Sequence, residues 1–193
     1  MMNAVPVARV DVERNRRILL DAAAGALAHD PDATLGDVAR RAGLARATLY
    51  RHFSSRESLL DALRDDAVEC AKEVVAGAQV GDGTALEALR RVVAGIVSLG
   101  ARFRPLLLEG AAQDPEFLRR REEAFMPVAV IVQRGQRAGE VKAEISVRWV
   151  VAALMALLAA AVRMDASLSE EEVVELVFGT LSLGIQGTHS TQN

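Results

Sequence analysis

The chain has 193 residues, a formal net charge of −3 and 51% apolar residues, and only 4% of its residues are aromatic. This length allows one or two small domains with a hydrophobic core, and the slightly acidic total argues against a protein that coats nucleic acid non-specifically. The dominance of alanine, leucine and valine favours an all-α fold over sheets, and the single cysteine excludes a disulfide framework.

The N-terminal part begins with a predicted flexible arm over residues 1–10, which lacks the long apolar run of a signal peptide. A first helix is predicted from Asp11 to His29, because apolar residues recur there at helical spacing. The sequence Asp30-Pro31-Asp32 ends this helix. The predicted apolar stripe consists of Ile18, Leu19, Ala22, Ala23, Ala26 and Leu27.

The stretch 34–53 predicts a helix, a tight turn and a second short helix. Thr34 is a good N-cap, and Gly43 suits the left-handed conformation that ends a helix. In the second helix, Leu49 and Phe53 are four residues apart and must be buried together. The opposite face is small, basic and aromatic, which suits the major groove of DNA. That face holds Arg46, Ala47, Tyr50 and Arg51.

An ordinary helical hairpin with a solvated basic face is the alternative interpretation, since this geometry also occurs outside DNA binding. Local charge favours the DNA-binding interpretation. Between Thr34 and Arg56 there are five arginines and one acid, which gives 5 − 1 = +4 in a chain of negative total charge. The predicted core of the first three helices comprises Ile18, Ala22, Val38, Leu44, Leu49 and Phe53.

The string T-L-x-D-V-A-x-x-A-G-L-A-x-A-T-L-Y-x-H-F, followed by S-S-R-E-S-L-L, closely resembles the DNA-binding domain of the TetR (tetracycline-repressor-like) family. The resemblance covers roughly residues 12–70. It implies that Arg46 and Ala47 face bases. It also implies phosphate contacts from Thr34, Thr48, Tyr50, His52 and Arg56. The sequence departs from the family at Gly36, a position often used there for base contact, so the resemblance does not imply that contact here.

The rest of the chain predicts further helices, with a linker at Val80-Gly81-Asp82-Gly83. A mid-helix kink is expected at Pro127, which would free the carbonyl of Glu123. The expected helices cover 55–78, 84–102, 105–113, 114–139, 146–164 and 169–187. The expected domains are a helix-turn-helix domain with a connecting helix over 11–78, a regulatory and dimerisation domain over 79–187, and a disordered tail over 188–193.

The segment Trp149 to Val162 is apolar nearly all round, so it must be buried nearly all round. At 14 residues it is too short to cross a bilayer, and the protein is expected to be cytoplasmic. We expect a homodimer, in which the last two helices form a four-helix bundle with their copies. The alternative is the core of a monomer. The expected interface residues are Ala152, Ala153, Ala156, Ala159, Val173, Val177 and Leu181.

Large side chains are concentrated between Thr84 and Met164, where the resemblance implies a pocket for a small, largely apolar effector. Aromatic and methionine stripes at helical spacing are also typical of plain core, and that alternative stays open for each residue. The resemblance further implies that the effector acts by moving the 55–78 helix. The candidate pocket residues are Phe103, Phe117, Phe125, Met126, Trp149, Met155 and Met164.

No catalytic or metal-binding constellation is present in the sequence. The three histidines are scattered, and no HxxxH, CxxC or HExxH spacing occurs, so we expect no metal, no cofactor and no enzyme. The predicted function is a ligand-responsive, sequence-specific regulator that represses transcription from a palindromic operator. The alternatives are a small helical enzyme and a structural helical adaptor with no role at DNA.

Overall fold

The computed structural model describes residues 7–79, 83–108, 114–163 and 168–186. The predicted tail, Met164 and most of the predicted linker lie outside these residues. The chain divides into two compact units: an N-terminal unit of Met1–Asp66 with Arg102–Ala111, and a C-terminal unit of Ala67–Ala101 with Ala112–Asn193.

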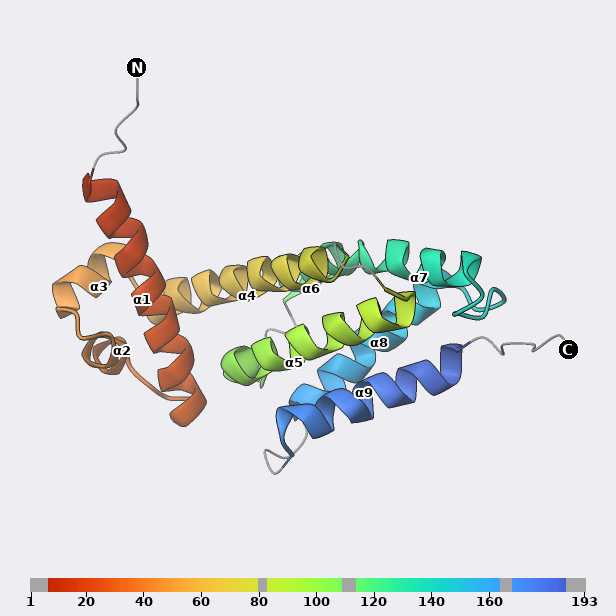
Figure 1. Cartoon of the computed structure of the whole chain (residues 1–193). Helices are drawn as coiled ribbons and strands as arrows, with labels where there is room; N and C mark the ends of the chain where they lie inside the picture. The colour runs from red at the N-terminus through yellow and green to blue at the C-terminus, as the bar shows by residue number, and fades with distance from the viewer. Residues whose placement is uncertain (1–6, 80–82, 109–113, 164–167, 187–193) are drawn as a thin grey trace, which may run out of the picture. The chain divides into compact units, whose positions relative to one another are not determined.

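The described residues form helices throughout (Figure 1), which confirms the predicted all-α fold. Among them there is no strand, only an isolated bridge between Val141 and Gln186. No helix in this part of the chain is long and apolar enough to span a membrane. The helices are α1 (Val7–His29), α2 (Leu35–Ala42), α3 (Arg46–His52), α4 (Arg56–Gln79), α5 (Ala85–Leu108), α6 (Pro115–Phe125), α7 (Val128–Arg137), α8 (Val147–Arg163) and α9 (Glu170–Ile185).

In the N-terminal unit, α1 packs on α2 and α2 packs on α3 around a small apolar core (Figure 1). The helix α1 begins at Val7, four residues before the predicted start. Ile18 and Leu44, both expected in the core, are only partly buried. The core is instead completed by the start of α4. Its main members are Leu19, Leu20, Ala23, Val38, Leu49, Phe53, Leu59 and Leu63.

The end of α5 belongs to the N-terminal unit, where Arg102 joins two other helices. Its guanidinium donates to the carboxylates of Asp21 in α1 and, at 3.0 Å, Asp66 in α4. The same guanidinium lies 4.8 Å from the ring centre of Phe103, which is buried. Burial raises the pKa of Asp66, and the charge of Arg102 opposes this rise.

In the C-terminal unit, α8 packs against both α7 and α9. The inner face of α8 consists of Val150, Leu154 and Leu158. The connection between α7 and α8 is fixed to the end of α9, because the backbone N–H of Lys142 donates to the carbonyl of Ile185 at 2.8 Å. The inner face of α9 consists of Val174, Val177, Leu181 and Ile185.

Three sequence-based expectations are corrected by this fold. The predicted break before Pro105 is wrong, since α5 continues to Leu108. A proline inside a helix removes one hydrogen bond and costs about 3 kcal/mol, and α5 with its 24 residues continues through Pro105 despite this cost. Pro127 separates α6 from α7 instead of kinking one helix, and the carbonyl of Glu123 accepts the N–H of Met126 at 3.2 Å, so it is not free. Within one chain α8 is not buried all round, because Trp149 is 68% exposed.

Candidate nucleic-acid interface

The turn between α2 and α3 is held by backbone geometry. Gly43 has a φ of 67°, a left-handed conformation that a side chain would strain. Its N–H donates to the carbonyl of Arg40 at 3.2 Å, and the N–H of Leu44 donates to the carbonyl of Ala39 at 3.0 Å. These bonds provide partners for carbonyl groups at the end of α2, and α3 begins three residues after Gly43.

A capping box fixes the start of α2. The backbone N–H of Thr34 donates to Asp37 at 2.9 Å, and the N–H of Asp37 donates to the hydroxyl of Thr34 at 3.3 Å. The Thr34 hydroxyl also donates to the Asp37 carboxylate at 2.5 Å. The hydrogen bonds from Thr34 lower the pKa of Asp37. Thr34 is exposed but its hydroxyl is already engaged within the box.

The two faces of α3 differ as the sequence predicts. Leu49 is fully buried and Phe53 nearly so, and these two residues fix the helix to the core. On the other side Tyr50 is 54% exposed. Arg46, Ala47 and Arg51 are also exposed, whereas Thr48 and His52 are partly buried. The short helix therefore presents a basic, aromatic surface without any acidic residue.

Arg46 extends from α3 back over the first turn of α2. A Cβ atom built on Gly36 would lie 2.8 Å from the Nη2 atom of Arg46, closer than real Cβ atoms approach other atoms. The missing side chain at Gly36 thus leaves the room that the guanidinium occupies. The sequence marks Gly36 as a departure from the family and Arg46 as an expected base contact, but the proximity of the two residues appears only in the structure.

Three other arginines of this region have hydrogen bonds of their own. Arg56, at the start of α4, donates to the carbonyl of Pro31 at 2.6 Å and thereby joins the α1–α2 loop to α4. Arg51 donates through Nε to the carbonyl of Ala47 at 3.2 Å. Arg40 bonds to Asp37 at 2.7 Å. Of the two arginines of α3, Arg51 therefore bonds within its own helix, whereas Arg46 extends to α2.

The candidate pocket residues fall in both units and differ in exposure. Phe103 is buried in the N-terminal unit, whereas Phe117 and Phe125 are buried in the C-terminal unit. Met155 is partly buried. Met126 and Trp149 are 63% and 68% exposed, so they point away from the core of the chain.

The candidate interface residues also differ in exposure. On α8, Ala152 and Ala156 are exposed and Ala153 and Ala159 are partly buried. On α9, Val173 is partly buried, while Val177 and Leu181 are each only 3% exposed. These last two side chains pack inside the single chain and offer no surface to a partner.

Comparison with known proteins identifies the family to which the segment with α2 and α3 is similar. The family model for bacterial regulatory proteins of the tetR family matches residues 19–63. The HTH-type transcriptional repressor LfrR of Mycolicibacterium smegmatis is 30% identical over 181 residues, which cover 90% of this chain and 91% of LfrR. The chain belongs to the TetR family. This TetR-family protein is therefore a DNA-binding transcriptional regulator and not an enzyme, and the enzyme and adaptor alternatives are set aside.

Further comparisons agree with this membership. The HTH-type transcriptional regulator NfxB of Pseudomonas aeruginosa is 32% identical over 75 residues, 39% of this TetR-family chain and 40% of NfxB. The crystal structure of LfrR from Mycobacterium smegmatis in complex with proflavine is similar with a TM-score of 0.73 and 28% identity, and covers 91% of this chain and 98% of that chain. A tetR-family regulatory protein from Rhodococcus RHA1 has a TM-score of 0.71 at 17% identity, over 90% and 98% of the two chains, and shows the fold alone.

Proposed function

We propose that this regulator is a cytoplasmic repressor, which binds a palindromic operator as a homodimer and is released by a small, largely apolar effector. The observation that best supports sequence-specific DNA binding is that α3 has two different faces. Leu49 and Phe53 are buried on one face, whereas Arg46 and Tyr50 are exposed on the other. The repressor LfrR, which is similar over most of its length, and its complex with proflavine support repression and a small-molecule effector.

In the proposed complex α3 lies in the major groove. Arg46 and Ala47 face base edges, where arginine bonds guanine and a small residue allows close approach of the backbone. The phosphate contacts come from Tyr50, Thr48, Thr34, His52 and Arg56. Phosphate contacts hold the register of the helix on the duplex but carry no sequence information of their own.

The proposed dimer uses the outer faces of α8 and α9. On α8 the exposed residues Trp149, Ala152 and Ala156 follow one another at helical spacing, with Ala160 one turn further on. On α9 the exposed apolar residues are Leu176 and Leu183, which is 81% exposed. These residues replace Val177 and Leu181 in the proposed interface, because the latter are already packed. A two-fold dimer would place its two recognition helices one DNA turn, about 34–36 Å, apart.

The proposed effector site lies in the C-terminal unit, next to Phe117 and Phe125. The helix α4 begins in one unit and ends in the other, since the boundary falls after Asp66. An effector that favours one arrangement of α4 over another would change the spacing of the two recognition helices. It acts only through its differential affinity for the two arrangements, and coupling of about 1–3 kcal/mol is typical.

The direct experiment is to measure binding of the purified protein to the DNA that flanks its own gene. Footprinting should give a palindromic protected site, and a screen of apolar compounds should give at least one that raises the melting temperature and releases that DNA. Stabilising compounds that all leave operator affinity unchanged would contradict the proposed switch. A protected site that lacks two-fold symmetry would contradict the proposed dimer.

A further inference from the structure

A single arginine lies in the middle of the buried face of α6. Arg121 is four residues after Phe117 and four residues before Phe125, so the three side chains share one side of the helix. Phe117, Ala124 and Phe125 are all buried, and Val128 at the start of α7 is fully buried. Arg121 itself is partly buried, and its Nε atom is completely covered.

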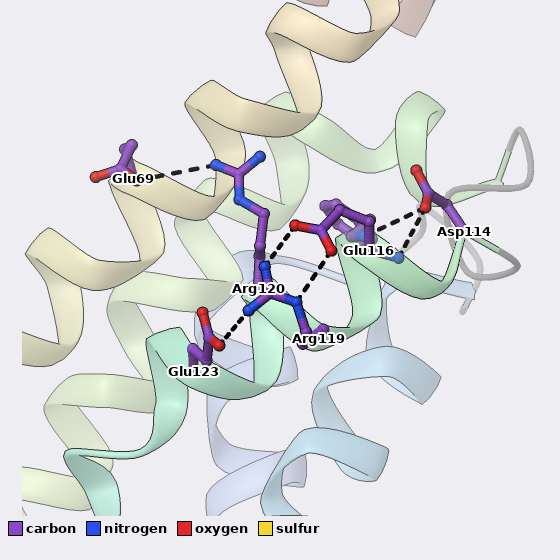
Figure 2. Close-up of polar contacts among 7 residues, drawn as sticks. Glu69, Asp114, Glu116, Arg119, Arg120 and Glu123 are labelled. Atoms are coloured by element: carbon purple, nitrogen blue, oxygen red, sulfur yellow. Dashed lines mark hydrogen bonds and ion pairs between the residues drawn. The ribbon is translucent and has the colours of Figure 1, made fainter.

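Arg121 differs from its two neighbours on the same helix, which are both paired (Figure 2). Arg119 bonds to Glu116 at 2.5 Å and also to Glu123, and Arg120 lies 4.0 Å from Glu69 of α4. The covered Nε of Arg121 has no hydrogen-bond partner. Among the described residues, no carboxylate forms an ion pair with its guanidinium.

This arrangement is unfavourable for a protein without a ligand. Burial lowers the pKa of Arg121, and the charge of its exposed neighbour Glu122 opposes this only in part. An arginine stays charged at any physiological pH, so it cannot relieve the loss of hydration by releasing its proton. Arg121 thus lies on the same side of α6 as the buried Phe117 and Phe125, and its covered Nε has no partner. An anion at this position would compensate for the hydration that the guanidinium has lost.

We propose that Arg121 binds the carboxylate of the effector, while Phe117 and Phe125 contact the apolar body of the same molecule. The ligand class is then an apolar carboxylic acid, aliphatic or aromatic. A guanidinium suits a carboxylate because its planar fork makes two parallel hydrogen bonds. This inference deepens the proposed function and rests on it, since the same C-terminal unit is taken to hold the effector.

The test uses matched pairs of ligands on the full-length protein. A panel of carboxylates, from octanoate to tetradecanoate and including 2-naphthoate, is compared with the alcohols of the same skeletons by calorimetry. At least one carboxylate should bind about 10- to 100-fold more tightly than its alcohol, as a charge-assisted hydrogen bond implies. A panel in which no carboxylate exceeds its alcohol overturns the proposal.

Variants assign the preference to one side chain. Arg121→Met should abolish the preference for the carboxylate and leave binding of the alcohol unchanged, whereas Arg121→Lys should retain part of it. Arg119→Met is the matched control, because Arg119 lies on the exposed side of the same helix; it should keep the full preference. A carboxylate preference that survives Arg121→Met overturns the proposal.

Two further measurements separate this proposal from the proposed function. Ligand-free Arg121→Met should melt at or above the wild-type temperature, because it removes an unpaired charge; a clear fall would assign Arg121 a structural role and overturn the proposal. Operator affinity without ligand should be the same for wild type and Arg121→Met. If operator binding is intact and carboxylates show no preference, only the present proposal fails; if wild type does not bind an operator, the proposed function fails.

Discussion

The Arg46 guanidinium lies where a side chain at position 36 would be, so a substitution of Gly36 should affect which operator sequence is bound. Gly36→Ala places a Cβ 2.8 Å from the Arg46 guanidinium, which must then move. Alanine stabilises a helix by about 0.5–1 kcal/mol relative to glycine, so the melting temperature should rise slightly. Base preference should nevertheless be lost at one operator position, and it should be the same position that Arg46→Ala affects.

Selection from randomised operators measures this prediction. The double variant Gly36→Ala with Arg46→Ala should be no worse than Arg46→Ala alone, because both changes remove one contact. Gly77→Ala is the control, since a Cβ at that exposed helical position meets nothing. Unaltered base preference in Gly36→Ala, or additive losses in the double variant, would show that the two residues act separately.

The Thr34–Asp37 capping box makes the stability of α2 depend on pH. The bonds from Thr34 lower the pKa of Asp37 in the folded state. A carboxylate with a depressed pKa stabilises the fold above its unfolded pKa of about 3.9, and this stabilisation is lost as pH falls through the lower folded value. Thr34→Ala should destabilise the protein by about 0.5–2 kcal/mol at pH 7. Urea unfolding from pH 7 to pH 3 should show this difference shrinking, and a constant difference would count against the box.

Mutations on the two faces of α3 should have different effects: on the buried face they should lower stability, and on the exposed face they should weaken DNA binding. Leu49 is fully buried, so Leu49→Ala should lower the free energy of unfolding by about 2–5 kcal/mol. Tyr50→Phe alters an exposed residue and should leave stability within about 0.5 kcal/mol while weakening DNA binding. Chemical denaturation and binding to the operator separate the two effects. Loss of stability in Tyr50→Phe, or none in Leu49→Ala, would mean that the faces are assigned wrongly.

Local signals made the element α2–turn–α3 predictable from sequence. Thr34, Gly43 and the pair Leu49 and Phe53 each act over a few residues, and their structural roles are confirmed. The prolines were less informative, because Pro105 is accommodated inside α5 while Pro127 ends α6. Whether a helix survives a proline depends on the packing around it, which sequence spacing does not contain.

The site residues were likewise predictable where the signal is local and not where it depends on tertiary packing. The exposed face of α3 could be predicted from its helical period alone. The contact between Arg46 and Gly36 joins two helices across a turn, so it depends on tertiary geometry. Arg121 did leave a signal that the sequence analysis missed, since a charged residue four positions from Phe117 and from Phe125 interrupts an apolar face.

The proposed homodimer can be tested by substitutions on the outer faces of α8 and α9. A single chain leaves Trp149 of α8 and Leu183 of α9 exposed, and in the proposed dimer a second copy covers both. Leu183→Glu and Ala156→Glu should each convert a dimer into a monomer at micromolar concentration, because each would bury an unpaired carboxylate. Sedimentation measures this. Val130→Glu is the control, since Val130 is 62% exposed on α7, and it should remain a dimer.

If Leu183→Glu and Ala156→Glu sediment as wild type does, the interface lies elsewhere. A wild-type chain that is monomeric without DNA would contradict the homodimer itself.

The proposed function requires α3 to distinguish one DNA sequence from another. The most direct measurement is the affinity of the wild-type chain for a selected palindrome and for a scrambled duplex of the same length and composition, at one salt concentration. The palindrome should be bound about 10³-fold or more tightly, and Arg46→Ala should lose about 1–3 kcal/mol on the palindrome only. Equal affinity of the wild type for both duplexes would contradict sequence-specific DNA binding by α3.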